Sequence, residues 1–341
     1  MTLSKTTVSA ARAPLVDVRN VVKHFPAAGD WFAQLFDRSR VHALDDVSFR
    51  IPPGTTLGIV GESGSGKSTI GKIMVGLTRP TAGSVVYDGQ NLAAMSPAER
   101  KAMRRRMQMI FQDPSSSLNR RKTAGQIVRE PLQVHGLAKD KTELKDKVSY
   151  TLERAGLSQR FVNRYPHELS GGQRQRIGIA RALAVDPEFI VCDEPVTALD
   201  VSIQAQILNL MLDLQRELEL TYVFISHDLS VVRHVSDYVA VMYLGEIVEL
   251  AETHKLFADP KHPYTQALMQ ALPTPDPTAG RRKALTGEIP SPINPPSGCR
   301  FHTRCPAYIG EVCHTHAPGP SITPDGGQVR CHLYSQASQA T

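Results

Sequence analysis

A glycine-rich segment that ends in a lysine and a serine has the composition of a phosphate-binding loop. Residues 61–68, GESGSGKS, fit the pattern G-x-x-x-x-G-K-[ST], with an apolar run at 56–60 before them and a helical pattern at 69–75 after them. Glycines let backbone N–H groups converge on anionic oxygens, and a helix N-terminus adds partial positive charge. Because all these features occur together, we expect a phosphate site here and not a glycine-rich turn that binds nothing.

Two side chains of this loop carry its specific chemistry. The Lys67 ammonium would reach the β- and γ-phosphates of a nucleotide, and the Ser68 hydroxyl would ligate Mg²⁺. The other residues predicted to line the nucleotide are Gly61, Ser63, Gly64, Ser65, Gly66 and Thr69.

A pair of acids follows a second apolar run. Residues 189–192 are apolar throughout, as expected of a strand buried on both faces, and they lead into Asp193 and Glu194. Ligands of open α/β sheets bind at the carboxyl edge, so we expect this pair beside the phosphate loop. Asp193 would hold Mg²⁺, and Glu194 would act as the general base toward the attacking water. The alternative is a helix-capping pair before Pro195.

A second segment could also bind an anion. In residues 169–173, LSGGQ, Ser170 is placed as an N-cap, and Gly171 and Gly172 expose backbone N–H groups at the positive end of a helix predicted at 174–184. A plain capped turn would show the same features. If both segments bind phosphate, the chain carries two separate anion sites.

Strands and helices must position these segments. Alternating patterns at 15–18 and 43–51 predict strands, separated by a polar insertion at 26–40, and residues 96–169 have a helical pattern. Strand and helix patterns then alternate up to residue 249, which is typical of parallel α/β units. A proline-rich stretch at 273–296 predicts a semi-rigid linker.

Length and composition limit the class of protein. The chain has 341 residues, 41% of them hydrophobic and 21% charged, which predicts about two globular domains and excludes a disordered or collagen-like chain. No run approaches the roughly 18 apolar residues of a membrane-spanning helix. Residues 1–14 lack the apolar stretch of a secretory signal, so we expect a disordered N-terminus and a cytosolic protein. The net charge of +6 selects no partner among nucleic acid, nucleotides and anionic membranes.

Four of the five cysteines lie near the C-terminus, and Cys192 alone sits in an apolar run as a small core residue. A cytosolic location disfavours disulfides, so the cluster indicates a metal site. Its spacing, C-x5-C-x7-C-x17-C, is wider than the usual zinc pairs and the common ferredoxin runs, so spacing alone cannot name the metal. The cluster comprises Cys299, Cys305, Cys313 and Cys331.

Taken in order, these motifs resemble those of the ABC (ATP-binding cassette) ATPases over residues 15–250. Residues 169–173 resemble the signature motif of that family. By the same resemblance Gln112 belongs to the Q-loop, where it is also a Mg²⁺ ligand, and residues 198–200, ending in Asp200, form the D-loop. His227 follows the strand at 222–226 and resembles the switch histidine, and Phe25 is the match for the aromatic residue that stacks on adenine.

The resemblance implies a fold and a mechanism. The fold is α/β: a P-loop cassette with a parallel-sheet core, an N-terminal antiparallel β subdomain and an inserted helical subdomain at about 96–169. Members of the family work as head-to-tail dimers, each ATP lying between the phosphate loop of one subunit and the signature motif of the other. Ser170, Gly171, Gly172 and Gln173 would then contact the partner's nucleotide, while Glu194, His227 and Gln112 serve catalysis in this subunit.

The C-terminal part narrows the resemblance further. Residues 262–268 (HPYTQAL), residues 291–298 (SPINPPSG) and the cysteine tail look like the extension of dipeptide/oligopeptide importer ATPases, of the second subunit type. This implies an ABC domain at 15–255 and an extension with a proline-rich linker and four-cysteine cluster at 256–341. Related ATPases hold an iron–sulfur cluster on matching cysteines, so a [4Fe–4S] cluster is expected, with zinc or reduced thiols as alternatives.

The same resemblance implies partners and a place in the cell. They are a second ATPase subunit, two transmembrane permeases and, through the complex, an extracytoplasmic peptide-binding protein, but no nucleic acid. The resemblance favours a heterodimer, while the sequence leaves open whether the second ATPase is an identical or a different chain. The subunit would lie peripherally on the cytoplasmic face of the inner membrane. Alternatives are an importer of nickel or another small solute, a soluble ABC ATPase acting on nucleic acid or ribosomes, and an iron–sulfur sensor. The substrate and the function of the insertion at 26–40 stay open.

Overall fold

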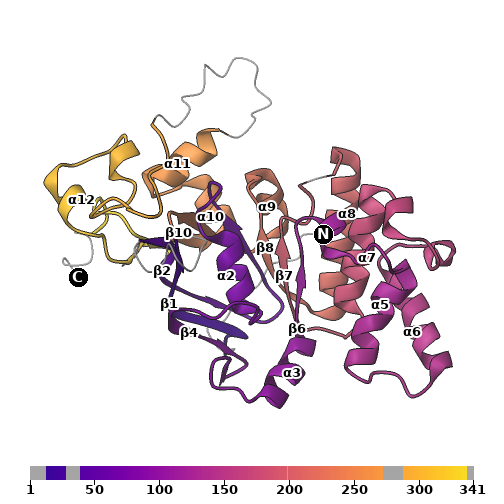
Figure 1. The fold of residues 1–341 in the computed structure, drawn as a ribbon. Coiled ribbons are helices and arrows are strands. Elements are labelled where there is room, and N and C mark those ends of the chain that lie inside the picture. The colour runs from indigo at the N-terminus through magenta and orange to yellow at the C-terminus, as the bar shows by residue number, and fades with distance from the viewer. Residues whose placement is uncertain (1–12, 28–38, 198, 272–286, 336–341) are drawn as a thin grey trace.

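The computed structural model describes residues 13–27, 39–197, 199–271 and 287–335 as two sheets with flanking helices (Figure 1). The predicted disordered terminus, most of the insertion at 26–40, Ala198 of the D-loop segment and most of the proline-rich stretch before residue 287 lie outside the described residues. None of the helices in the described ranges is long and apolar enough to cross a membrane.

The first sheet is a four-stranded antiparallel layer with the order β2-β1-β4-β5. Its strands are β1 (Val16–Pro26), β2 (Arg40–Ile51), β4 (Ala82–Tyr87) and β5 (Gln90–Asn91). β1 and β2 pair from Val16↔Ile51 to Pro26↔Arg40, so the insertion predicted at 26–40 joins the ends of a hairpin. The N-terminal antiparallel β layer expected from the sequence is therefore present.

The second sheet has eight strands in the order β11-β12-β10-β9-β3-β8-β7-β6. They are β3 (Thr56–Val60), β6 (Met107–Ile110), β7 (Phe189–Asp193), β8 (Thr221–Ile225), β9 (Tyr238–Tyr243), β10 (Glu246–Glu252), β11 (Ser321–Ile322) and β12 (Gln328–Val329). The neighbouring strands β9, β3, β8, β7 and β6 are parallel. Every residue of β3, β7 and β8 is buried. Continuous apolar runs are what a sheet covered on both faces requires.

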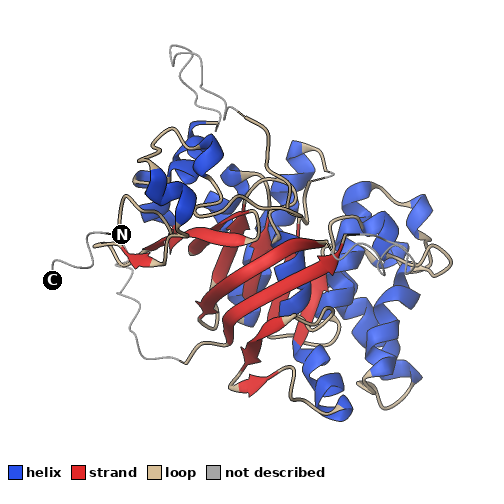
Figure 2. Ribbon diagram, turned by 60° about the vertical axis from the view of Figure 1, so that its left-hand side comes forward, coloured by secondary structure: helices blue, strands red, loops and turns tan. Residues whose placement is uncertain are grey.

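Helices pack on the two faces of this parallel sheet. Alternate side chains of β7 point to opposite sides: Phe189 and Val191 join the core that contains α2 (Lys67–Met74), whereas Ile190 and Cys192 join the core that contains α7 (Gly171–Leu183). α2 and α7, the two helices that follow the predicted anion-binding segments, therefore lie on opposite faces. The core that contains α7 also includes side chains of α8 (Val201–Leu218) and α9 (Leu229–Val235). Figure 2 shows helices on both sides of the strands.

The segment at 96–169 is mostly helical, with one difference from the expectation. It contains α3 (Pro97–Arg106), α4 (Pro114–Ser117), α5 (Ala124–Val134), α6 (Lys141–Arg154) and two 3₁₀ turns (Gln159–Phe161 and Pro166–Glu168). Capping boxes at Ser96 and Thr123 start α3 and α5. Residues 107–110, however, form β6 and pair with β7, because three of the four side chains are buried as the last parallel strand.

The C-terminal part packs against both sheets. It contains α10 (Thr253–Ala258), α11 (Pro263–Gln270), a 3₁₀ turn (His302–Arg304) and α12 (Glu311–Thr315). The short strand β12 pairs with β10 and continues the eight-stranded sheet, and the His42 N–H donates to the Pro292 carbonyl across to the first sheet. The extension is thus joined to the cassette by main-chain hydrogen bonds.

Candidate active site

The glycine-rich loop links β3 to α2 in a conformation that its glycines allow. Gly61, Gly64 and Gly66 all have positive φ, and a Cβ on Gly61 would come within 2.1 Å of the Met242 carbonyl oxygen. Gly66 caps α2 without a side-chain hydrogen bond, which leaves the first N–H groups of the helix available to an anion. The geometry is that of a phosphate-binding loop.

Lys67 lies folded into this loop. Its Nζ donates to the carbonyl oxygens of Gly61 and Glu62, each at 2.8 Å, and the residue is 6% exposed. Burial lowers the pKa of this amine, while the nearby carboxylates of Glu194 and Asp193 raise it. An ammonium held only by carbonyls and nearby acids can exchange these contacts for phosphate oxygens.

Ser68 and Asp193 come together as predicted for a Mg²⁺ site. The Ser68 hydroxyl, at the start of α2, donates to Oδ1 of Asp193, the last residue of β7, at 2.8 Å. Burial raises the pKa of Asp193, and the hydrogen bond from Ser68 opposes that rise. A hydroxyl and a buried carboxylate are oxygen donors of the kind Mg²⁺ prefers, so the pair fits this cation.

Three of the predicted catalytic side chains meet at Glu194. Gln112 Nε2 donates to Glu194 Oε2 at 2.8 Å, and His227 Nδ1 lies 3.3 Å from the same oxygen. Glu194 has a φ of 46°, a left-handed conformation that is rare outside glycine, and its N–H donates to the Ile225 carbonyl oxygen. The loop after β7 therefore holds the carboxylate in a strained position where it contacts two other loops.

The sequence analysis missed Thr197. Its hydroxyl donates to Glu194 Oε2 at 3.2 Å, so it is a hydrogen-bond donor to this oxygen beside Gln112. The only available signal was its position three residues after Glu194, and threonine in a turn is too common to be informative.

The second predicted anion-binding turn forms a capping box. Ser170 Oγ accepts from the Gln173 N–H at 3.3 Å, and Gln173 Oε1 accepts from the Ser170 N–H at 3.0 Å. A Cβ on Gly172 would come within 2.5 Å of Ile203 in α8, which starts after Asp200. The turn is therefore packed against the predicted D-loop region and lies on the other face of the sheet from Lys67.

Phe25 lies near the end of β1 and is 38% exposed, with the Lys23 ammonium 4.8 Å from its ring centroid. An exposed aromatic face suits base stacking. No contact within the described part of the chain tests this role.

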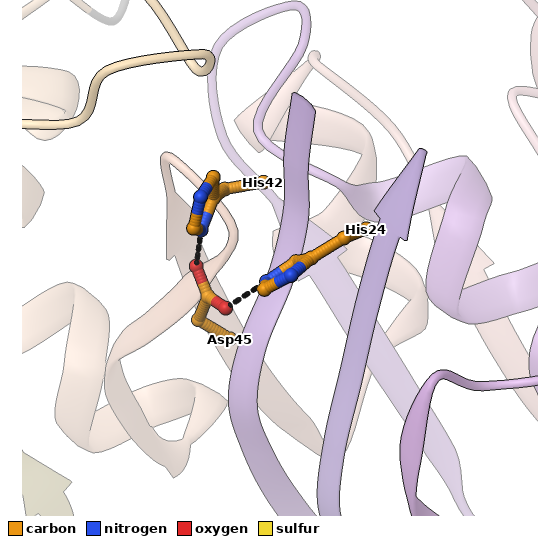
Figure 3. Close-up of side chains that lie close together, drawn as sticks. All are labelled: His24, His42 and Asp45. Atoms are coloured by element: carbon orange, nitrogen blue, oxygen red, sulfur yellow. Dashed lines mark hydrogen bonds and ion pairs between the residues drawn. The ribbon is translucent and has the colours of Figure 1, made fainter. Parts of the chain in front are cut away.

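Near Phe25, two histidines face one carboxylate (Figure 3). His24 Nε2 lies 2.5 Å from Asp45 Oδ1 and His42 Nδ1 lies 3.0 Å from Oδ2, and the three residues form a group of potential metal ligands within the described ranges. Arg300 Nη2, however, donates to Asp45 Oδ2 at 2.5 Å. Although burial raises it, hydrogen bonds from Arg300 and the histidines hold the pKa of Asp45 below its ordinary value. The guanidinium already supplies the positive charge, so this network needs no metal.

The four C-terminal cysteines lie close together as free thiols. Burial, with a smaller contribution from the neighbouring cysteines, raises the pKa of Cys299 to about 12 and that of Cys331 to about 11. Backbone N–H groups two residues downstream donate to three of the sulfurs: Phe301 to Cys299, Ala307 to Cys305 and Leu333 to Cys331. All four cysteines are described, and no three of their sulfurs come within 4.8 Å of one another, so they do not form the tight tetrahedron of a mononuclear zinc site.

Comparison with protein families gives two matches. A model for ABC transporters matches residues 44–197, which include the phosphate loop and the acids after β7. A model for the C-terminal region of oligopeptide/dipeptide transporters matches residues 248–313.

Curated relatives match over nearly the whole chain. It is 49% identical over 329 residues to a putative oligopeptide transport ATP-binding protein, YkfD of Bacillus subtilis, covering 96% of this chain and 97% of that protein. It is 50% identical over 331 residues to the oligopeptide transport ATP-binding protein AppF of Bacillus subtilis, covering 96% and 99%. A putative peptide import ATP-binding protein of Brucella ovis is 51% identical over 306 residues, covering 89% and 93%.

Solved structures support the cassette fold. The ATP-binding cassette MJ0796, in a dimeric post-hydrolysis state bound to ADP and Pi, matches with a TM-score of 0.61 and 32% identity over 70% of this chain and 98% of that chain. CbiO1 from Clostridium perfringens, part of the cbiONQ ABC transporter complex, matches with a TM-score of 0.62 and 25% identity, covering 73% and 92%.

Replacing Asp193 by Asn should stabilise the metal-free protein. Because burial raises the pKa of this carboxyl, ionising it in the folded state costs free energy that an amide avoids, while Ser68 keeps an oxygen acceptor. We expect the free energy of unfolding near neutral pH to rise by about 1 kcal/mol. The gain should disappear at low pH. Once the pH falls below the raised pKa of Asp193 in the folded protein, the wild-type carboxyl is protonated and no longer pays the cost of ionisation.

Urea unfolding in the presence of a chelator, over a series of acidic pH values, measures this difference. Asp200→Asn, at the exposed start of α8, is the control and should give no gain. A gain in Asp193→Asn that persists unchanged at low pH would show that ionisation is not its cause.

Proposed function

This chain belongs to the family of ABC transporter ATP-binding proteins, and on that premise we propose that it binds and hydrolyses ATP to drive oligopeptide uptake. One observation carries the catalytic part of the proposal. The Lys67 loop, the Ser68–Asp193 pair and the Glu194 cluster all lie at the carboxyl edge of β3, β7 and β8. Nucleotide binding and water activation need these groups side by side.

We assign the phosphate contacts to the loop at 61–69. Its backbone N–H groups, with those at the start of α2, would surround the β- and γ-phosphates, and Lys67 would leave its two carbonyl partners for phosphate oxygens. Mg²⁺, when bound by Ser68, Asp193 and Gln112, neutralises charge on these oxygens. Phe25 would stack on the adenine.

Glu194 is the proposed general base. Its carboxylate would orient the attacking water and take its proton as the bond to the γ-phosphorus forms. Gln112 and Thr197 donate to one oxygen of the carboxylate and hold it in place, and His227 would contact the γ-phosphate from the loop after β8.

A second subunit would complete each site. Since α2 and α7 lie on opposite faces of the sheet, a nucleotide of another subunit, and not the one on Lys67 of the same chain, is the ligand that we assign to the Ser170 turn. We propose that Ser170, Gly171, Gly172 and Gln173 contact ATP bound to a partner, with Asp200 at the interface. The partner is a different ATPase subunit, so the working unit is a heterodimer.

The importer as a whole contains further chains. We propose two transmembrane permeases, whose cytoplasmic helices dock near Gln112 and the helical subdomain at about 96–169, and an extracytoplasmic peptide-binding protein. The subunit then lies on the cytoplasmic face of the membrane. The cassette would span 15–255 and the extension 256–341.

We propose that the four C-terminal cysteines hold a [4Fe–4S] cluster, with zinc as the alternative metal. The N–H donors to three of the sulfurs and the mutual proximity of all four support a metal–thiolate site.

Glu194→Gln should abolish turnover and leave ATP binding intact. Loss of a general base lowers the rate by about 10²–10⁴-fold, and the isosteric amide keeps the shape of the site. Phosphate release and labelled-peptide uptake by the assembled importer measure the loss. Lys67→Ala should instead lose ATP binding. Glu188→Gln, at the other end of the same strand, is the matched control; normal hydrolysis by Glu194→Gln would refute the base assignment.

Purification from detergent-solubilised membranes should recover the proposed partners. Mass spectrometry should identify two polytopic permeases and a second, non-identical ATPase, because the Ser170 half-site needs another nucleotide-bearing subunit. Recovery of identical copies alone would refute the heterodimer. Recovery with ribosomal proteins or nucleic acid would refute the transport function.

Cys305→Ser should remove the metal from the purified chain. The wild-type protein, isolated without oxygen, should contain iron and acid-labile sulfide and absorb broadly in the visible range. Cys192→Ser, a core cysteine outside the cluster, should keep both. Zinc without iron in the wild type would select the alternative metal.

A further inference from the structure

Glu62 of the phosphate loop forms an ion pair with Arg304 of the C-terminal extension. Arg304 Nη1 donates to Glu62 Oε2 at 2.7 Å, and Nη2 donates to Glu62 Oε1 at 3.0 Å. The guanidinium therefore binds the carboxylate through two parallel hydrogen bonds. The side chain of Arg304 is 4% exposed and that of Glu62 is 23% exposed. Such a bidentate, largely desolvated pair fixes both direction and distance.

A second contact from the extension fixes the main chain of the same residue. The Glu62 N–H donates to the phenolic oxygen of Tyr264 at 2.9 Å, and Tyr264 is fully buried in α11. Glu62 is therefore held through both its side chain and its backbone, and both contacts come from the C-terminal extension.

Arg304 and Tyr264 both pack against a cluster of aromatic side chains. The ring centroid of Tyr264 lies 4.7 Å from that of Tyr243 and 5.3 Å from that of Phe301, and each of the three residues is at most 1% exposed. The Arg304 guanidinium lies 5.8 Å from the Tyr243 ring centroid and donates to its hydroxyl at 3.3 Å. Close packing of this kind leaves little freedom for either residue.

These contacts bear on the nucleotide because Glu62 also contacts Lys67. The carbonyl oxygen of Glu62 accepts from Lys67 Nζ, and it also accepts from the Ser65 N–H at 3.2 Å. A shift of Glu62 would move the resting position of the lysine and the N–H groups that face the phosphates. Without Arg304, the Glu62 carboxylate would also lie unpaired beside the triphosphate.

We propose that Arg304 and Tyr264 are positioning residues of the ATP site, which preorganise the phosphate loop by holding Glu62. The inference rests on the proposed ATPase function. Neither residue is assigned a contact with ATP, so both act on affinity through the loop.

The test measures binding of a fluorescent ATP analogue with Mg²⁺ to the full chain. Arg304→Met should raise the Kd by about tenfold or more, and Arg304→Lys, which keeps the charge but loses the bidentate geometry, should recover part of the affinity. Tyr264→Phe, which removes only the phenolic oxygen, should give a smaller loss. Adding Glu62→Gln to Arg304→Met should recover only the part of the affinity that the unpaired carboxylate costs, because the loop stays without its bidentate contact.

Arg330→Met is the matched control. Arg330 is another arginine of the extension; it pairs with Asp46 in β2, and its side-chain hydrogen bonds within the described residues go to Asp46 and not to Glu62. It should leave the Kd unchanged. An equal loss in Arg330→Met would show that general loosening of the extension is responsible and overturn the proposal. Full rescue by Glu62→Gln would show that the unpaired charge, and not the position of the loop, is responsible and would also overturn it. An unchanged Kd in folded Arg304→Met would overturn it as well. If the wild type binds no better than Lys67→Ala, the ATPase function itself fails.

Discussion

The in-register pairing of three buried parallel strands determines where the chemistry of this protein lies. β8 pairs with β3 on one side and with β7 on the other, so the loops after all three strands emerge at the same edge. The hydrogen bond between Ser68 and Asp193 and the contact of His227 with Glu194 follow from that pairing. The contact of Gln112 with Glu194 follows from the pairing of β6 with β7. Because the strands are covered on both faces, polar groups are tolerated only at their ends.

The parts of the site that depend on local sequence could be predicted. The glycines of the phosphate loop and the acids after an apolar run are required by backbone geometry and burial within a few residues. Long-range packing had no such local signal. The strand at Met107–Ile110 is short and follows an arginine run, so only its pairing with β7 makes it a strand. Arg304 and Glu62 are 242 positions apart, and nothing in either segment indicates the other.

The two faces of the sheet explain why the motifs are divided as they are. Val191 packs toward the helix of the phosphate loop, and its neighbours Ile190 and Cys192 pack toward the helix of the Ser170 turn. One sheet thus separates the two helix ends that the proposed mechanism needs on one nucleotide. In that mechanism, sharing the site between subunits makes closure of the dimer a condition for hydrolysis, which would couple ATP use to movement of the partners.

The pair between Glu62 and Arg304 also orders events during synthesis. Ribosomes add about 5–20 residues per second, so the 242 positions between the two residues correspond to a delay on the order of tens of seconds. During that time the phosphate loop has been made, but the residue that grips it has not. The nascent chain can therefore pair the strands up to β10 first and receive the contact from Arg304 only afterwards.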